Sequence, residues 1–247
     1  GAHSIHEEIQ KRGLKKSVVG IPKTIDNDIQ YVTMTFGYAT ALAQAEEVLR
    51  SAHVEARCAP NGIGLVKLMG RDAGFIAAGA ALISQEANFV LVPEIPFPMD
   101  GPDGLLSHLE HRLKTREHAL VVVAEGAGQH LFQADDVATD ASGNKLHQDI
   151  GVYLQHRIKA YFAERNIPIN LKYLDPSYFI GCVPANAFDR FLCDQMARHA
   201  VHAAMAGKTD VQIGSSHQRV VHLPIRTVVS GKKQIDRDYL LWTGVLA

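Results

Sequence analysis

The stretch Gly20-Ile-Pro-Lys-Thr-Ile-Asp-Asn-Asp-Ile29 decides how the rest of the chain is interpreted. It overlaps a short apolar run at residues 17–21, which predicts a β-strand that ends at Pro22. A cation, a hydroxyl and two carboxylates then follow within six residues: Lys23, Thr24, Asp26 and Asp28. In open α/β sheets, ligands bind at the carboxyl ends of the strands. The stretch therefore indicates a candidate site directly after a strand.

Two interpretations of these residues stay open on residue types alone. Asp26 and Asp28 are two positions apart, so in an extended turn both side chains would face the same way. One carboxylate could then accept a proton from a hydroxyl while the other holds a hydrated Mg²⁺, and Lys23 could meet a phosphate. The alternative is a polar turn in which Asp28 caps a helix.

Composition excludes several classes of protein. The chain has 247 residues, 47% of them hydrophobic, and a net charge of −1, which implies no general affinity for nucleic acid. No apolar run approaches the roughly 18 residues of a membrane span, and we expect no signal peptide. The odd number of cysteines (Cys58, Cys182 and Cys193) lacks metal-type spacing and predicts reduced thiols in a cytoplasmic protein.

Strand-like and helix-like patterns alternate along the chain. Strands are predicted at residues 63–68, 88–93, 119–124 and 170–174, and near 211 and 220. Helices are predicted at residues 40–53, 75–84, 104–116, 149–165, 187–206 and 236–242, while residues 129–147 form a polar, turn-rich surface segment. This order predicts an α/β fold with a mostly parallel sheet and helices on both faces.

The first residues have the pattern of the later part of an amphipathic helix, with Ile5 and Ile9 on one face and a stop at Gly13. A helix that leads into a strand normally follows an earlier strand. We therefore expect the chain to begin inside a domain whose first elements are absent.

Polar residues also follow two later strands. Gly70 and Arg71 could let a backbone turn approach an anion, with the arginine donating a fork of hydrogen bonds. Glu125 is followed closely by two glycines and could accept hydrogen bonds from sugar hydroxyls, although an acid at this place could also cap a helix or lie on the surface. The pair Lys232 and Lys233 is interpreted as solvated surface.

Taken together, the motifs resemble the phosphofructokinase family over residues 1–225. The stretches that carry the resemblance are Pro22-Lys-Thr-Ile-Asp-Asn-Asp28, Phe36-Gly37, Val66-Lys-Leu-Met-Gly-Arg71, Val92-Pro-Glu94, Val123-Ala-Glu-Gly126, Lys172-Tyr173, Asp175-Pro-Ser-Tyr178 and Pro184-Ala-Asn186. The block Ala141-Ser-Gly-Asn-Lys145 is similar to the subgroup that includes plant and protist ATP-dependent enzymes.

The resemblance implies transfer of a phosphoryl group to the 1-hydroxyl of fructose 6-phosphate. It implies that Asp26 is the base, that Thr24 and Lys23 lie along the transferring phosphoryl group, and that Asp28 is near Mg²⁺. Arg71 would neutralise phosphoryl charge, and the implied sugar-phosphate residues are Met69, Gly70, Glu125, Lys172 and Tyr178. Catalysis of this kind consists mainly of positioning and charge stabilisation.

The chain departs from the family pattern in two places. The subgroup usually has an arginine three residues after the tyrosine, and here that position is Gly181, so a phosphate-clamping cation is missing. The glycine-rich loop of the donor site is also absent from these residues. The similarity to the subgroup implies ATP as donor, with pyrophosphate as the alternative. Because the donor loop is absent, we expect little activity from this chain by itself. Gly181 makes a non-catalytic regulatory subunit a third possibility.

The family architecture implies two doubly wound, three-layer α/β lobes. The first, incomplete and on the donor side, would use residues 1–38 and 180–232, and the second, on the sugar-phosphate side, residues 39–179 and 233–247. Fructose 6-phosphate would be the partner ligand, and the protein would form a homo-oligomer, a dimer or a tetramer, in the cytoplasm.

Overall fold

The computed structural model describes residues 1–132, 148–217 and 219–247, and it divides the chain into two compact units. Unit 1 comprises residues 1–41 and 183–234, and unit 2 comprises residues 42–182 and 235–247. Most of the predicted surface segment 129–147, and with it the Ala141–Lys145 block, lies outside the described residues.

Unit 2 is built on a parallel sheet of four strands. Its order is β3 (Phe89–Leu91), β4 (His118–Ala124), β2 (Gly62–Leu68) and β5 (Asn170–Leu174), and every neighbouring pair is parallel. Leu68 pairs with Ala124 at the carboxyl ends of the two central strands. The residues that follow, Met69 and Glu125, therefore emerge at the same edge of the sheet.

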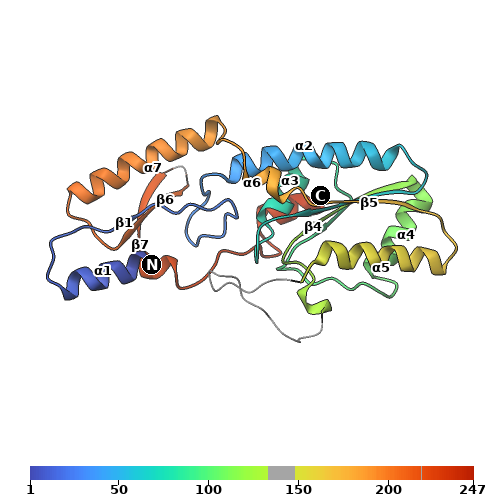
Figure 1. Ribbon diagram of the computed structural model, residues 1–247, viewed down its shortest axis with the longest axis horizontal. Helices are drawn as coiled ribbons and strands as arrows, with labels where there is room; N and C mark the ends of the chain where they lie inside the picture. The colour runs from blue at the N-terminus through green and yellow to red at the C-terminus, as the bar shows by residue number, and fades with distance from the viewer. Residues whose placement is uncertain (133–147, 218) are drawn as a thin grey trace. The chain divides into compact units, whose positions relative to one another are not determined.

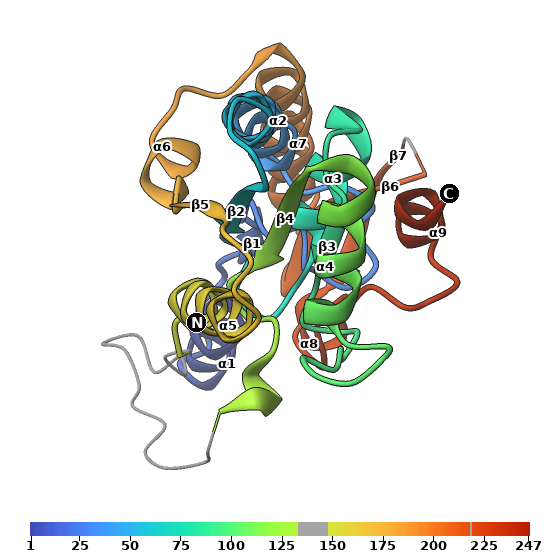
Figure 2. The same ribbon diagram turned by 90° about the vertical axis from the view of Figure 1, so that its right-hand side faces the viewer.

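Helices cover both faces of this sheet (Figures 1 and 2). On one face, α4 (Leu105–Arg116) and α5 (Ile150–Glu164) pack against the strands in one core cluster, which includes Leu65, Leu109 and Leu154. On the other face lie α2 (Tyr38–Arg57) and α3 (Phe75–Ser84). Each fully buried leucine stabilises such a core by about 1.5–3 kcal/mol. These three layers hold the carboxyl edge of the sheet rigid.

Unit 1 contains a smaller sheet in the order β1 (Val19–Gly20), β6 (Val211–Ser216) and β7 (Arg219–Pro224). β1 is parallel to β6, whereas β6 and β7 are antiparallel. Helix α7 (Ala187–Met205) packs on one face, and α1 (Ala2–Lys11) lies on the other side with α8 (Ile225–Val228) (Figure 1). The sheet places the chain directly after β1 at its carboxyl edge.

The predicted α/β fold with a mostly parallel sheet is confirmed, and α3 has the predicted bounds. The predicted last helix was misplaced, because α9 spans Leu240–Leu246. The Asp236 carboxylate accepts the N–H of Asp238 and forms a local turn that delays the helix. The sequence analysis missed three short helices, η1 (Gln129–Leu131), α6 (Ser177–Gly181) and α8 (Ile225–Val228).

The three cysteines are free, as predicted, and the structure shows that all three are exposed. Within the part of the chain that the structure describes, no helix is long and apolar enough to cross a membrane.

Candidate active site

The loop after β1 turns back on itself around Asn27. Asn27 has a left-handed backbone conformation, with φ at 57°, and its side chain is buried. Its Oδ1 accepts the backbone N–H of Thr35 at 3.0 Å. The expectation of an extended turn is therefore wrong, and the buried amide instead fixes the loop between the two half-buried aspartates, Asp26 and Asp28.

The helix-cap interpretation of Asp28 is also wrong, because the next helix, α2, begins only at Tyr38. Asp26 donates its backbone N–H to the Thr24 hydroxyl oxygen at 3.1 Å, which closes a tight local turn. Polar side chains of the loop therefore stabilise the conformation of its own backbone.

The base of this loop is closed by a parallel bridge between Lys23 and Phe36. The next residue, Gly37, has φ at 96°, and a Cβ placed there would lie 2.7 Å from Cγ2 of Ile25. Only glycine fits both the backbone angle and the close approach. This requirement explains the Phe36-Gly37 pair of the sequence.

Lys233 lies far from this loop in the sequence but contacts it, so its assignment to the solvated surface is wrong. Its ammonium donates to the carbonyl oxygens of Val32 at 2.8 Å and Thr33 at 3.3 Å, and its backbone N–H donates to the carbonyl of Asp28 at 2.8 Å. Burial lowers the pKa of Lys233 to about 8, although Asp28 acts to raise it. In the sequence, this position is marked only by two lysines that follow a glycine. That pattern does not indicate which groups Lys233 contacts.

In unit 2, the predicted site residues after β2 and β4 do lie together. Glu125 Oε1 accepts the backbone N–H groups of Gly70 at 3.2 Å and Arg71 at 2.6 Å. Both donors have unusual backbone angles, with φ at 144° and 51°. The carboxylate therefore stabilises the strained turn that presents Arg71.

Gly126 makes this approach possible. A Cβ at Gly126 would lie 2.0 Å from the carbonyl oxygen of Arg71. Any side chain would push the two loops apart, so packing explains the glycine after Glu125.

Glu94, which follows β3, has a structural role. Its carboxylate accepts the N–H of Gly74 at 3.0 and 3.1 Å, ahead of α3, and Oε1 also accepts the N–H of Ile235 at 3.2 Å. It ties the C-terminal segment to the sheet of unit 2.

The two residues expected to clamp a phosphate are not joined by a described contact. Lys172, on the edge strand β5, lies 4.0 Å from the Glu55 carboxylate on α2, and both side chains are more than half exposed. Tyr178, on α6, is 77% exposed. Gly181 ends α6, and a Cβ added there would have one neighbour within 4 Å among the residues that the structure describes, Cε of Met69 at 3.9 Å. A longer side chain would therefore fit at this position.

No group of three or more metal-ligating side chains occurs among residues 1–132, 148–217 and 219–247. Mg²⁺ usually binds through one or two protein carboxylates, with phosphates and water supplying the remaining ligands. Asp28 is part of the loop that also carries Lys23 and Thr24, and its carboxylate fits that donor set.

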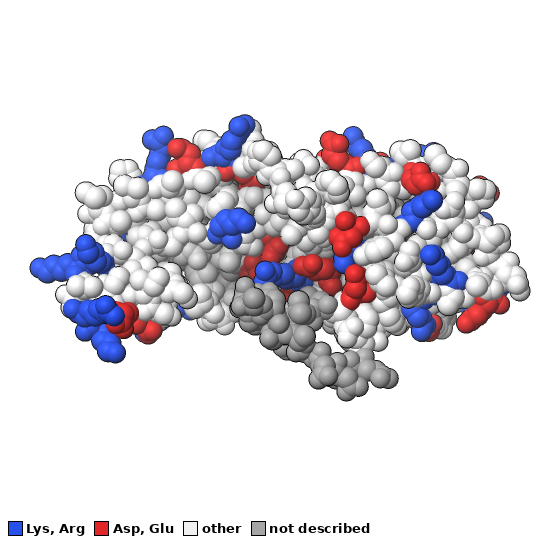
Figure 3. Space-filling view, viewed as in Figure 1, with Lys and Arg blue, Asp and Glu red and all other residues white. Residues whose placement is uncertain are grey.

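Acidic and basic side chains are interspersed on the face drawn in Figure 3. This distribution matches the net charge of −1.

The fold and the site define an α/β protein that carries polar, glycine-containing loops at the carboxyl ends of its parallel strands. The chain belongs to the phosphofructokinase family, because the sequence model described as Phosphofructokinase matches residues 1–204.

Two relatives illustrate the similarity. An ATP-dependent 6-phosphofructokinase from Borreliella burgdorferi is 48% identical over 253 residues, which cover 100% of this chain and 57% of that protein. A chloroplastic ATP-dependent 6-phosphofructokinase 5 from Arabidopsis thaliana is 46% identical, with 98% and 45% covered. The chain thus spans about half the length of the curated relatives it matches.

A solved structure has the same fold. The pyrophosphate-dependent phosphofructokinase from Marinobacter aquaeolei matches with a TM-score of 0.75 at 19% identity, and the match covers 100% of this chain and 64% of that chain. The phosphofructokinase-like fold expected from the sequence is therefore confirmed.

Proposed function

We propose that the protein carrying this chain is a 6-phosphofructokinase of glycolysis, which moves a phosphoryl group from ATP to the 1-hydroxyl of fructose 6-phosphate. Relatives at 46–48% identity that are named ATP-dependent 6-phosphofructokinase support ATP as the donor. The observation that carries the proposal is the binding of the Gly70 and Arg71 N–H groups by Glu125. At one edge of the sheet, this contact brings together two groups. One is a carboxylate suited to accept hydrogen bonds from sugar hydroxyls, and the other is the backbone of an arginine suited to neutralise phosphoryl charge.

In the proposed reaction Asp26 accepts the proton of the 1-hydroxyl. A bond forms between that oxygen and the γ-phosphorus, and the bond from the γ-phosphorus to the bridging oxygen breaks, which releases ADP. Lys23 and Arg71 offset the charge on the phosphoryl oxygens, and Thr24 lies along the transferring phosphoryl group. Positioning and electrostatics of this kind supply most of the catalysis in phosphoryl transfer.

Asp28 is the residue that would hold Mg²⁺. When bound, the ion would neutralise charge on the donor phosphates. The bonds from Lys233 to the carbonyls around this loop keep the Asp28 backbone in place.

The sugar phosphate would be bound by residues of unit 2. Met69, Gly70 and Glu125 would contact the sugar, while Lys172 and Tyr178 would contact the 6-phosphate. The exposure of Lys172 and Tyr178 leaves both side chains accessible to a ligand.

Gly181 is the observation in favour of a second function, a non-catalytic regulatory subunit. It leaves the phosphate region without the guanidinium that the family pattern has there, and charge-assisted bonds to phosphate are the strong ones. Pyrophosphate as donor is the second enzymatic possibility, since Lys23 is compatible with either donor.

A coupled assay of the full-length protein decides among these functions. Formation of fructose 1,6-bisphosphate is measured with fructose 6-phosphate plus Mg²⁺ and either ATP or pyrophosphate. We expect turnover with ATP. Turnover with pyrophosphate but not with ATP would show that pyrophosphate is the phosphoryl donor. If the protein turns over neither donor but activates a catalytic partner subunit, the regulatory function would be supported and the catalytic one excluded.

We further propose that the protein is a cytoplasmic homo-oligomer, a dimer or a tetramer. The free thiols of the three cysteines support a reducing compartment. Sedimentation measurements of the full-length protein test the oligomeric state.

A further inference from the structure

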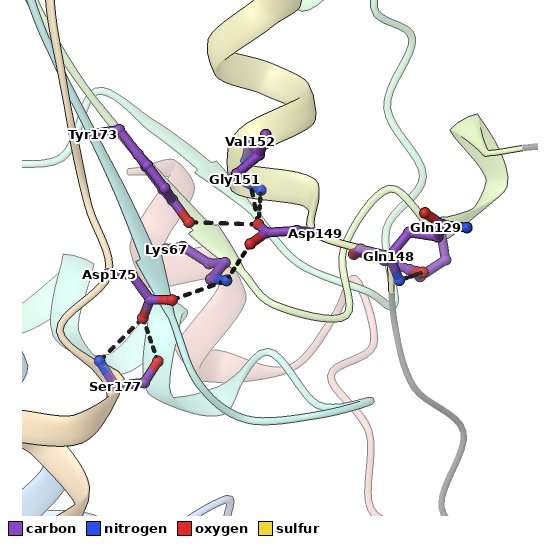
Figure 4. Close-up of polar contacts among 9 residues, drawn as sticks. All are labelled: Lys67, Gln129, Gln148, Asp149, Gly151, Val152, Tyr173, Asp175 and Ser177. Atoms are coloured by element: carbon purple, nitrogen blue, oxygen red, sulfur yellow. Dashed lines mark hydrogen bonds and ion pairs between the residues drawn. The ribbon is translucent and has the colours of Figure 1, made fainter. Parts of the chain in front are cut away.

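Lys67 has a largely buried side chain and forms a charge cluster in unit 2 with two exposed carboxylates from later parts of the chain (Figure 4). It is the penultimate residue of β2, and its side chain is 13% exposed. Its ammonium lies 2.9 Å from Oδ2 of Asp175 and 3.1 Å from Oδ2 of Asp149. The cluster therefore joins the end of the central strand to two later segments.

The Asp149 branch organises a helix. Oδ1 of Asp149 accepts the N–H groups of Gly151 at 3.0 Å and Val152 at 3.2 Å, so the carboxylate caps the start of α5. The Tyr173 hydroxyl donates to the same oxygen at 3.4 Å (Figure 4). This branch supports the layer beneath the sheet.

The Asp175 branch organises the segment proposed to bind the sugar phosphate. Oδ1 of Asp175 accepts the N–H of Ser177 at 3.1 Å and its hydroxyl at 2.6 Å. Ser177 is the first residue of α6, which carries Tyr178 and ends at Gly181. The position of α6 therefore depends on the position of the Asp175 carboxylate.

Both ends of the proposed sugar-phosphate region meet at Lys67. It precedes Met69 by two residues in the chain, and Met69 lies next to Gly181, with its Cε 3.9 Å from a Cβ placed there. Through Asp175 the same lysine holds the start of α6. One side chain thus connects the Met69–Arg71 turn to the helix that faces it.

The charge of Lys67 is retained in this environment. Burial acts to lower the pKa of Lys67, but the hydrogen bonds to Asp175 and Asp149 outweigh it and hold the pKa above its ordinary value. At neutral pH the lysine is therefore a cation between the two carboxylates.

We infer that Lys67 is a positioning residue for sugar-phosphate binding: its ion pair with Asp175 fixes α6, and so Tyr178, against the Met69–Arg71 turn. The inference rests on the proposed function, because it assigns the ligand of α6 from that reaction. Lys67 itself does not touch the substrate.

The two branches supply a matched control. The test compares Lys67→Met, Lys67→Arg, Asp175→Asn and Asp149→Asn in the full-length protein. We expect Lys67→Met and Asp175→Asn to raise KM for fructose 6-phosphate about tenfold while kcat and KM for ATP change less. Lys67→Arg should recover most of the loss, and Asp149→Asn should lower Tm with little effect on KM.

Hydrogen exchange provides a readout that does not need turnover. Lys67→Met should accelerate exchange of the backbone amides of residues 177–181 well beyond the effect of Asp149→Asn. Equal KM values in Lys67→Met and Asp149→Asn, or unchanged exchange at residues 177–181, would overturn the inference. If the wild-type protein does not phosphorylate fructose 6-phosphate, the proposed function fails, and the exchange data alone decide whether Lys67 holds α6.

Discussion

Asp189 and Thr40 lie 149 residues apart in the sequence and are joined by two hydrogen bonds inside unit 1. Oδ2 of Asp189 accepts the Thr40 backbone N–H at 2.7 Å and the Thr40 hydroxyl at 2.5 Å. The hydroxyl oxygen in turn accepts the N–H of Asn186 at 2.9 Å. Both side chains are buried, so the start of α2 and the start of α7 depend on one another.

Thr40→Val should therefore destabilise unit 1. The substitution keeps the shape but removes a hydroxyl from a buried carboxylate, which costs about 1.5–3 kcal/mol of unfolding free energy. Urea unfolding followed by circular dichroism measures the change. Thr40→Ser, which keeps the hydroxyl, is the control and should cost less; equal losses in the two variants would contradict a role for the hydroxyl.

Asp26→Asn should remove the proposed base. We expect kcat to fall about 10²–10⁴-fold while KM for fructose 6-phosphate stays nearly constant, since a base acts on the proton in the transition state. Steady-state kinetics of the full-length protein measure both constants. Asp103→Asn, at an exposed aspartate, should leave them unchanged; retained turnover in Asp26→Asn would assign the base elsewhere.

Gly181→Arg should tighten binding of fructose 6-phosphate. The position has room for a side chain, and a restored cation should improve binding by roughly 1.5–3 kcal/mol. Gly181→Met adds length without charge and controls for the effect of bulk on α6. A KM that does not fall in Gly181→Arg would show that another group already neutralises the 6-phosphate.

Lys233→Met should loosen the loop that contains Asp26. The ammonium donates to two carbonyls of that loop, and we expect kcat to fall by about tenfold when the bonds are lost. Lys232→Met is the matched control, because Lys232 is the exposed neighbour. Similar kinetics in both variants would mean that the loop keeps its shape without the amine.

Asp175→Asn should change how stability depends on pH. Burial acts to raise the pKa of Asp175, but hydrogen bonds from Ser177 and Lys67 hold it below the ordinary value of 3.8 in the folded protein. A carboxyl with a lowered folded pKa stabilises the protein above its unfolded pKa and loses that contribution as the pH falls through the folded pKa.

The difference in unfolding free energy between wild type and Asp175→Asn should therefore be constant from about pH 7 to about pH 5. It should shrink below about pH 4. Urea titrations at several pH values measure it. A difference that persists unchanged into the acid range would show that Asp175 acts without its charge.

Local patterns predicted the elements whose causes are local. The small apolar residues of α3 and the Asn186 cap of α7, whose Oδ1 accepts the Asp189 N–H at 2.9 Å, could be recognised in the sequence. The turn at Asp236 and the turn at Asp175 just before α6 were also local, but the sequence analysis overlooked both. A side chain that bonds its own backbone two residues on is a usable signal for such turns.

The parts of the site that could not be predicted depend on tertiary contacts. Glu125 was expected to bind a ligand, but nothing local indicated that it also binds the Gly70 and Arg71 amides. Lys233 has its partner 201 residues away, at Val32. Lysine is mostly exposed in proteins, so residue type alone favoured the wrong environment.

The bond from Lys233 to Val32 also sets an order of events during synthesis. All strands of the unit 2 sheet lie between residues 62 and 174, so that sheet can form while the C-terminal segment is still inside the ribosome. The contact between the Asp26 loop and Lys233 can form only after Lys233 has been synthesised. The 201 residues from Val32 to Lys233 correspond to about 10–40 s of translation. The sheet of unit 2, without residues 235–247 of that unit, is therefore complete about 3–12 s of translation before Lys233 is added, because 59 residues separate Leu174 from Lys233 (233 − 174).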